Sequence, residues 1–181
     1  HFAEDYGLET RVARYHNVYG PHGTYDGGRE KAPAAVCRKV IAAQLSGQDE
    51  IEVWGDGEQT RSFMYIDDCV YGTRALMASD ISEPLNVGSD EMVTINQLID
   101  IVEDIAGKKV KRRYNLSAPK GVRGRSSENT LIKQKLGWAP RHTIEDAVRD
   151  MCKAFKAGML PNSMDDDRYV NVKTVKQLAL R

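Results

Sequence analysis

The sequence has few cysteines, no excess of charge of either sign and no long hydrophobic run. Cys37, Cys69 and Cys152 are widely spaced and never form a Cys-x-x-Cys pair, which argues against a disulfide framework and a zinc site. Lysine plus arginine and aspartate plus glutamate number 26 each, so the overall charge does not indicate nucleic acid or an anionic membrane as a partner. No apolar run approaches the roughly 18 residues of a membrane span, and no signal peptide opens the chain. We therefore expect a cytoplasmic protein with reduced thiols, in which an acidic ligand would have to be met by a local cluster of cations.

The elements expected from the sequence alternate between strands and helices, which predicts the α/β class. With 181 residues, of which 41% are hydrophobic, the chain can bury one core and a second small lobe. Expected strands are 10–18, 50–54, 61–66, 85–87 and 110–114. Expected helices are 32–45, a helix capped by Asp67 that reaches about residue 78, 95–106 capped by Thr94, 131–136 and 143–157.

Two features concern the ends of the chain. Residues 1–160 are expected to form one unit, whereas 161–181 begin with a polar, acidic run and are interpreted as a loosely attached tail. The first residue is His1 rather than methionine, so we expect the natural polypeptide to begin earlier.

A glycine-rich loop is the most informative local feature. The strand-like run Arg14-Tyr-His-Asn-Val-Tyr-Gly-Pro leads into a segment, 20–28, with four glycines in nine residues, and Lys31 follows just before a predicted helix. Glycine lets the backbone approach a ligand closely and adopt positive φ, so the loop is suited to wrapping a small polar molecule. Lys31 is then a candidate acid or base, and a cationic neighbour such as Arg29 would help it to lose a proton. The plain alternative is a solvated lysine at a helix start.

Several cationic side chains stand at predicted element junctions rather than on helix faces. They are Lys39, Arg61, Arg123 and Arg125, the last two in the turn Gly121-Val-Arg-Gly-Arg. Arginine binds phosphate oxygens in a bidentate fashion, and the glycines would let this turn close against a diphosphate. We favour an anion clamp built on Arg61 and Arg125. The alternative is a set of surface ion pairs, which contribute only ~0–1 kcal/mol each.

Longer motifs carry a resemblance to a known family. Arg14-Tyr-His-Asn-Val-Tyr-Gly-Pro, Trp54-Gly-Asp-Gly-Glu-Gln-Thr-Arg-Ser-Phe and Pro84-Leu-Asn-Val-Gly-Ser resemble the C-terminal half of extended short-chain dehydrogenase/reductases that act on nucleotide sugars. Among these, the GDP-mannose 3,5-epimerases are the most similar family. The pieces that discriminate them are Gly27-Gly-Arg-Glu-Lys-Ala-Pro-Ala-Ala, Gly57-Glu-Gln-Thr-Arg-Ser-Phe, Ser89-Asp-Glu-Met-Val, Gly121-Val-Arg-Gly-Arg-Ser-Ser-Glu-Asn and Leu136-Gly-Trp-Ala-Pro. The resemblance covers about 6–157 and leaves out the tail.

The resemblance also implies parts that the sequence does not contain. Such enzymes have a Gly-x-x-Gly-x-x-Gly loop after their first strand, which binds the pyrophosphate of NAD, and a catalytic Tyr-x-x-x-Lys pair. Tyr169 and Lys173 have the second spacing but lie in the tail, so we interpret them as coincidence. The implied fold is therefore the C-terminal part of a Rossmann-like reductase without its N-terminal dinucleotide-binding strands. Such a chain would be inactive alone, with NAD bound mainly by the other half.

The resemblance assigns roles to individual residues. In the family, NAD oxidises the sugar at C4, and an acid/base pair then exchanges protons at C3 and C5. Lys31 would be one member of that pair, and its cysteine partner would lie in the other half; Cys37 is expected to pack in the core. The substrate would be held by Asn17, Glu30, Lys39, Gln59, Arg61 and Arg125. Tyr19 and Gly20 would border the nicotinamide.

Some interpretations stay open at this point. His16 and His142 have no partner at metal-ligand spacing, so no metal is implied. Trp54, Tyr65 and Trp138 are assigned to packing. The other readings of function are a UDP-sugar 4-epimerase or dTDP-sugar dehydratase, and a non-catalytic module that binds nucleotide sugars. An open sheet edge would make pairing with a second copy, as a homo-oligomer, plausible.

Overall fold

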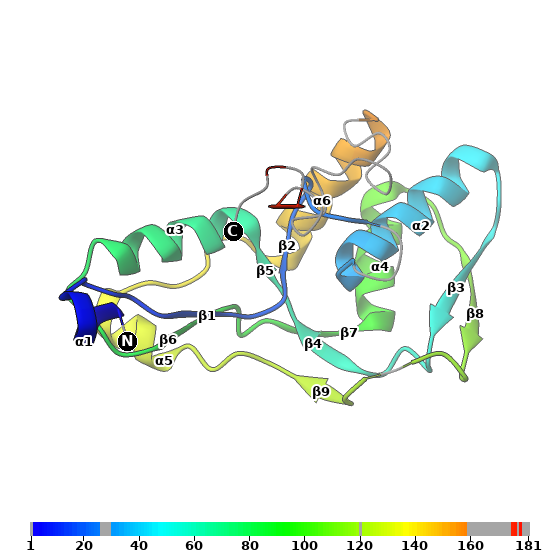
Figure 1. The fold of residues 1–181 in the computed structure, drawn as a ribbon. Coiled ribbons are helices and arrows are strands. Elements are labelled where there is room, and N and C mark those ends of the chain that lie inside the picture. The colour runs from blue at the N-terminus through cyan, green and yellow to red at the C-terminus, as the bar shows by residue number, and fades with distance from the viewer. Residues whose placement is uncertain (1, 26–29, 120, 159–174, 177, 179–181) are drawn as a thin grey trace.

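The computed structural model describes residues 2–25, 30–119, 121–158, 175–176 and 178. Figure 1 shows two groups of elements joined by strands that run between them. Helices α2, α4 and α6 and the strand pair β3–β8 lie at one end, and β1, β6, α1, α3 and α5 lie at the other. This arrangement confirms the predicted α/β class.

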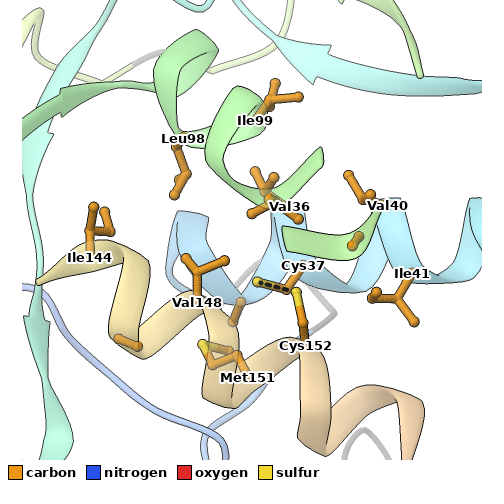
Figure 2. Packing of buried hydrophobic residues seen from close by; sticks show 14 of the residues in the cluster. Val36, Cys37, Val40, Ile41, Leu98, Ile99, Ile144, Val148, Met151 and Cys152 are labelled. Atoms are coloured by element: carbon orange, nitrogen blue, oxygen red, sulfur yellow. Dashed lines mark hydrogen bonds between the residues drawn. The ribbon is translucent and has the colours of Figure 1, made fainter. Parts of the chain in front are cut away.

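The first group is built on three helices that pack against one another. They are α2 (Ala32–Ser46), α4 (Ile95–Ala106) and α6 (Ile144–Lys156), accompanied by the parallel pair β3 (Glu50–Trp54) and β8 (Lys111–Asn115). Figure 2 shows Cys37 of α2 and Cys152 of α6 pointing toward each other, with their sulfur atoms 3.9 Å apart. All three cysteines are free and buried, as predicted. This core supports α2 and α4, which form two sides of the cavity described below.

The second group surrounds Trp138, whose side chain is only 1% exposed. The parallel pair β1 (Ala13–Tyr15) and β6 (Leu85–Val87) is flanked by α3 (Ile66–Met77) and α5 (Thr130–Leu136), and the short helix α1 (Phe2–Tyr6) precedes β1. A Cβ atom on Gly72 of α3 would lie 2.9 Å from the Trp138 ring, so the ring and the helix are in close contact. The packing role predicted for Trp138 is confirmed.

Short strands connect the two groups. In a parallel pair, β2 (Val18–Tyr19) adjoins β5 (Met64–Tyr65). A second sheet places β4 (Thr60–Ser62) between the antiparallel β7 (Met92–Thr94) and the parallel β9 (Gly124–Arg125). These pairings bring segments 30 to 64 residues apart in the sequence side by side.

The single strands predicted over 10–18 and 61–66 are wrong. The first is divided into β1 and β2 at Asn17, which has a φ of +43°, and the second is divided into β4 and β5 by Phe63. Each division lets the chain leave one sheet and join another. Strands β7 and β9, which are three and two residues long, were not predicted from the sequence.

The helix caps were predicted with mixed success. Thr94 and Thr143 each form a capping box, with Gln97 and Asp146 respectively, as expected. Asp67 is not a cap, because α3 begins at Ile66 and its N-cap is Tyr65. Asp67 instead lies in the first turn, where its charge suits the helix dipole. Among the described residues, no helix is both long and apolar enough to cross a bilayer.

Candidate functional site

A cavity of about 520 Å³ lies between α2, β3, β4 and the start of α4. Its lining includes both polar and apolar side chains from segments far apart in the sequence. Six of the residues predicted to act on a ligand are among them: Asn17, Glu30, Lys31, Lys39, Gln59 and Arg61. The fold therefore gathers most of the predicted site around one space large enough for a small ligand.

The apolar part of the lining comes from the core of the first group. Val36, Ile51, Val53, Phe63 and Ile99 contribute to it, and each is buried. These side chains are fixed by close packing on their other sides, so this part of the cavity is rigid.

Trp54 stands at the edge of this apolar part. Its side chain lines the cavity yet is 46% exposed, and its indole Nε1 donates a hydrogen bond to Oε2 of Glu52 at 3.2 Å. The packing role predicted for Trp54 is therefore wrong. Trp54 ends β3 and belongs to the cavity lining, while its side chain stays partly in solvent.

Two polar residues on the wall are oriented by backbone carbonyl groups. Lys39 Nζ donates to the carbonyl oxygen of Glu52 at 2.7 Å, and Gln59 Nε2 donates to the carbonyl oxygen of Trp54 at 3.0 Å. Within the described part of the chain, the other amide atom, Gln59 Oε1, is buried and has no hydrogen-bond partner. A buried acceptor of this kind is costly unless a donor reaches it, so Gln59 offers a bonding position to a ligand.

Asn17 is held in an uncommon backbone conformation at the junction of the two groups. Its φ of +43° lies in the left-handed region, which asparagine tolerates better than most residues. Its amide Nδ2 donates to the carbonyl oxygen of Ser62 at 3.0 Å and lies 3.2 Å from Nε2 of His16. These contacts fix the amide where it lines the cavity.

Arg61 and Arg125 are direct neighbours across β4 and β9. Their Cα atoms are register partners in a parallel ladder, so their side chains leave the sheet on the same face. Arg61 also donates to the carbonyl oxygens of Thr60, at 2.7 Å, and of Val122. Arg125 is exposed and lies beside the cavity rather than in its lining. The two guanidinium groups expected to form a clamp therefore start from adjacent positions.

Positively charged side chains near His16 affect the pKa of its imidazole. Burial lowers its pKa first, the positive charge of Arg125 lowers it further, and Lys31 and Arg61 add to the effect. Three predicted site residues are thus close enough to act on one side chain. The sequence interpretation considered His16 only as a metal ligand and missed its place in this cluster; its position directly before Asn17 was the available signal.

Lys31 occupies the N-cap position of α2. Its backbone is extended, with φ −80° and ψ 152°, and its side chain is exposed to solvent while lining the cavity. Glu30 precedes it and is half-buried, and no described residue hydrogen-bonds its Oε2 atom. A helix N-terminus favours anions, so this end of α2 suits a negatively charged ligand.

Tyr19 and Gly20 do not line the cavity. The Tyr19 ring is 5% exposed and packs edge-on against Phe63 and Tyr65, each at 6.0 Å between ring centres, and burial raises its pKa. A Cβ atom on Gly20 would lie 2.4 Å from Cγ2 of Ile66, so glycine is needed there for packing against α3. Their assignment to the nicotinamide border stays a prediction.

Other predictions fall on parts of the chain that the structure does not describe. These are Arg29 as a neighbour of Lys31, the end of the glycine loop, the pair Tyr169 and Lys173, and most of the tail.

Comparison with known proteins relates the chain to one family. Residues 1–88 match the NAD dependent epimerase/dehydratase family. The chain is 53% identical over 149 residues to GDP-mannose 3,5-epimerase 1 of Oryza sativa subsp. indica and 52% identical over 149 residues to GDP-mannose 3,5-epimerase of Arabidopsis thaliana. Each alignment covers 82% of this chain but 38% of the relative, so the chain spans well under half the length of these relatives.

Two solved structures of nucleotide-sugar epimerases are also similar to the chain. UDP-glucose 4-epimerase of Thermotoga maritima, determined with UDP-glucose, matches with a TM-score of 0.77 and 30% identity over 87% of this chain and 49% of that one. UDP-glucuronic acid 4-epimerase of Bacillus cereus, determined with UDP-glucuronic acid and NAD, matches with a TM-score of 0.69 and 26% identity over 86% and 48%. These similarities confirm the resemblance that the motifs predicted. They also confirm the predicted Rossmann-like α/β fold.

Proposed function

Because residues 1–88 match the NAD dependent epimerase/dehydratase family and the chain resembles GDP-mannose 3,5-epimerases, we propose that it is the nucleotide-sugar-binding part of an enzyme that epimerises GDP-mannose at C3 and C5. The chain covers 38% of the GDP-mannose 3,5-epimerases that it resembles, and the proposal places the remaining functions of the enzyme outside it. Alone, the chain is expected to bind a nucleotide sugar without converting it.

One observation carries this proposal. Lys31 and Arg61 line one cavity, Arg125 is the register partner of Arg61 beside it, and the same lining has an apolar part and an exposed tryptophan. A nucleotide sugar has matching parts, since its diphosphate needs cations and its base needs an aromatic or apolar surface.

The geometry suggests where each part of the ligand binds. Arg61 and Arg125 leave adjacent strands on one face and would hold the diphosphate from that side. The base would enter the apolar part between Ile51 and Trp54, where Gln59 Oε1 can accept a hydrogen bond from it. The sugar would then lie toward Asn17.

Lys31 is proposed as the acid/base residue at the sugar. It lines the same cavity as Asn17, at the exposed end of α2. A ketone at C4 of the sugar makes the protons on C3 and C5 acidic, because the resulting carbanions spread into the carbonyl group. Lys31 would give or take one of these protons. The proposal places its partner on the opposite face of the ring, in the part of the enzyme outside this chain.

Tyr19 and Gly20, the two residues predicted to border the nicotinamide, are closely packed in the structure. Tyr19 is enclosed by aromatic rings, and Gly20 faces Ile66, so neither presents an open surface to a dinucleotide. We therefore propose that NAD, which the family uses, binds mainly to the rest of the enzyme, and we assign no hydride-transfer step to this chain.

The three buried free cysteines support a cytoplasmic location.

Titration calorimetry with GDP-mannose and UDP-glucose tests the proposal. The expected result is one site per chain and at least about tenfold tighter binding of GDP-mannose, which corresponds to about 1.4 kcal/mol. A preference for UDP-glucose would favour a UDP-sugar enzyme instead, a second candidate supported by the match to the Thermotoga maritima structure. Binding of neither compound would contradict both.

A further inference from the structure

His16 lies at the point where the chain leaves β1 and enters β2. Its backbone N–H donates to the carbonyl oxygen of Val87 at 3.3 Å, and its ring is half-buried. A Cβ atom on Gly88 would lie 3.1 Å from the Cβ atom of His16 and 2.4 Å from Oγ of Ser127. The backbone of Gly88 therefore packs closely against the Cβ atom of His16.

The contacts of Asn17 determine which ring nitrogen of His16 carries the proton. A carbonyl oxygen can only accept, so the Asn17 atom that lies 3.0 Å from the Ser62 oxygen must be the amide nitrogen Nδ2. The same nitrogen lies 3.2 Å from Nε2 of His16. Because Nδ2 donates, Nε2 must accept, and the proton of the neutral imidazole is then on Nδ1.

The ring of His16 also lies close to a different strand. The charge of Arg125 lowers the pKa of His16 and the backbone of Arg125 raises it, so the imidazole lies beside β9. Strand β9 is only two residues long and pairs with β4 at two positions.

We propose that neutral His16 is a positioning residue of the anion site, which holds the Asn17 amide in the orientation in which Asn17 lines the cavity. The inference rests on the proposed function, since that function gives Asn17 its ligand. His16 itself does not line the cavity. It acts through Asn17, with Nε2 accepting a hydrogen bond from the amide.

The loss of His16 has a specific consequence. Without the ring nitrogens, the Asn17 amide keeps only the Ser62 carbonyl, and its left-handed backbone loses part of its support. The amide would have to be ordered again when a ligand binds, so affinity would fall although Asn17 itself had not been changed.

Two variants separate positioning from mere packing. His16→Phe keeps an aromatic ring and removes the hydrogen bond with Asn17, whereas His16→Gln can still accept it. Affinity for GDP-mannose and for inorganic pyrophosphate is measured by calorimetry, with thermal unfolding as the test that each variant is folded. We expect GDP-mannose binding to weaken about tenfold in the phenylalanine variant, in line with the loss of about one net hydrogen bond. The glutamine variant should stay within about threefold of the parent chain.

Nitrogen NMR of the unliganded chain provides a second readout that needs no ligand. We expect the Nδ1–H tautomer of His16, and a shift of the Asn17 amide signals in the phenylalanine variant that the glutamine variant largely reverses. The Nε2–H tautomer, equal affinities in parent and phenylalanine variant, or equally weak binding by two folded variants would overturn the inference. If the parent chain binds no nucleotide sugar, the proposed function fails, and the tautomer and amide signals still decide whether His16 positions Asn17.

Discussion

Replacement of Arg125 by alanine tests the anion clamp at its most accessible member. Arg125 is exposed, so its removal should change the free energy of unfolding by no more than ~0.5 kcal/mol. A charge-assisted hydrogen bond to a phosphate contributes about 1.5–3 kcal/mol. The dissociation constant of GDP-mannose should therefore rise by roughly 10- to 150-fold. Arg61, its register partner, would remain as the second contact.

Calorimetry at one fixed salt concentration measures this effect, because affinities of charged ligands depend on ionic strength. Arg125→Lys keeps the charge but loses the bidentate fork, and should lie between the parent chain and the alanine variant. Arg149→Ala is a matched control, since Arg149 is an exposed arginine on α6, a helix that contributes nothing to the cavity lining. Unchanged affinity in a folded Arg125→Ala chain, or an equal loss in the Arg149→Ala control, would refute the clamp.

Three further predictions follow from the same structure. In an enzyme that joins this chain to a dinucleotide-binding part, Lys31→Ala should abolish solvent deuterium incorporation at C3 and C5 while cofactor reduction by the substrate persists; loss of both would limit Lys31 to binding or folding. Trp138→Ala should lower the free energy of unfolding by ~3–5 kcal/mol in a denaturant titration, because the ring is 1% exposed in the second core; a cost below about 1 kcal/mol would contradict that packing. Burial, Arg125, Lys31 and Arg61 lower the pKa of His16, so the unfolded chain takes up the proton first, and stability should fall as the pH drops from about 6.5 to the lowered pKa. The His16→Gln chain should lose this component, and an identical pH dependence of unfolding in the two chains would count against it.

Helices were the part of the fold that the sequence predicts best. Thr94 and Thr143 stand three residues before Gln97 and Asp146, and these local pairs fix where α4 and α6 begin. The error at Asn17 has a different origin. A run rich in β-branched and aromatic residues predicts one continuous strand, yet the break depends on contacts with Ser62, 45 residues away. No local pattern contains that information.

The candidate site could be assembled from the sequence only through the resemblance to known enzymes. Arg61 and Arg125 are 64 positions apart, and nothing in their local sequence states that β4 and β9 pair with these two residues in register. Trp54 was missed because a tryptophan at the end of a strand is usually buried, whereas here it borders the cavity. His16 was missed because Arg125, Lys31 and Arg61, whose charges act on its pKa, are brought near it only by the fold.

A crystal structure of the chain with GDP-mannose would test most directly whether the scattered cations meet at one diphosphate. We predict that its phosphate oxygens lie within hydrogen-bond distance of the guanidinium groups of both Arg61 and Arg125, with the base beside Trp54. A diphosphate that contacts neither arginine, or a ligand bound outside the cavity, would contradict the account.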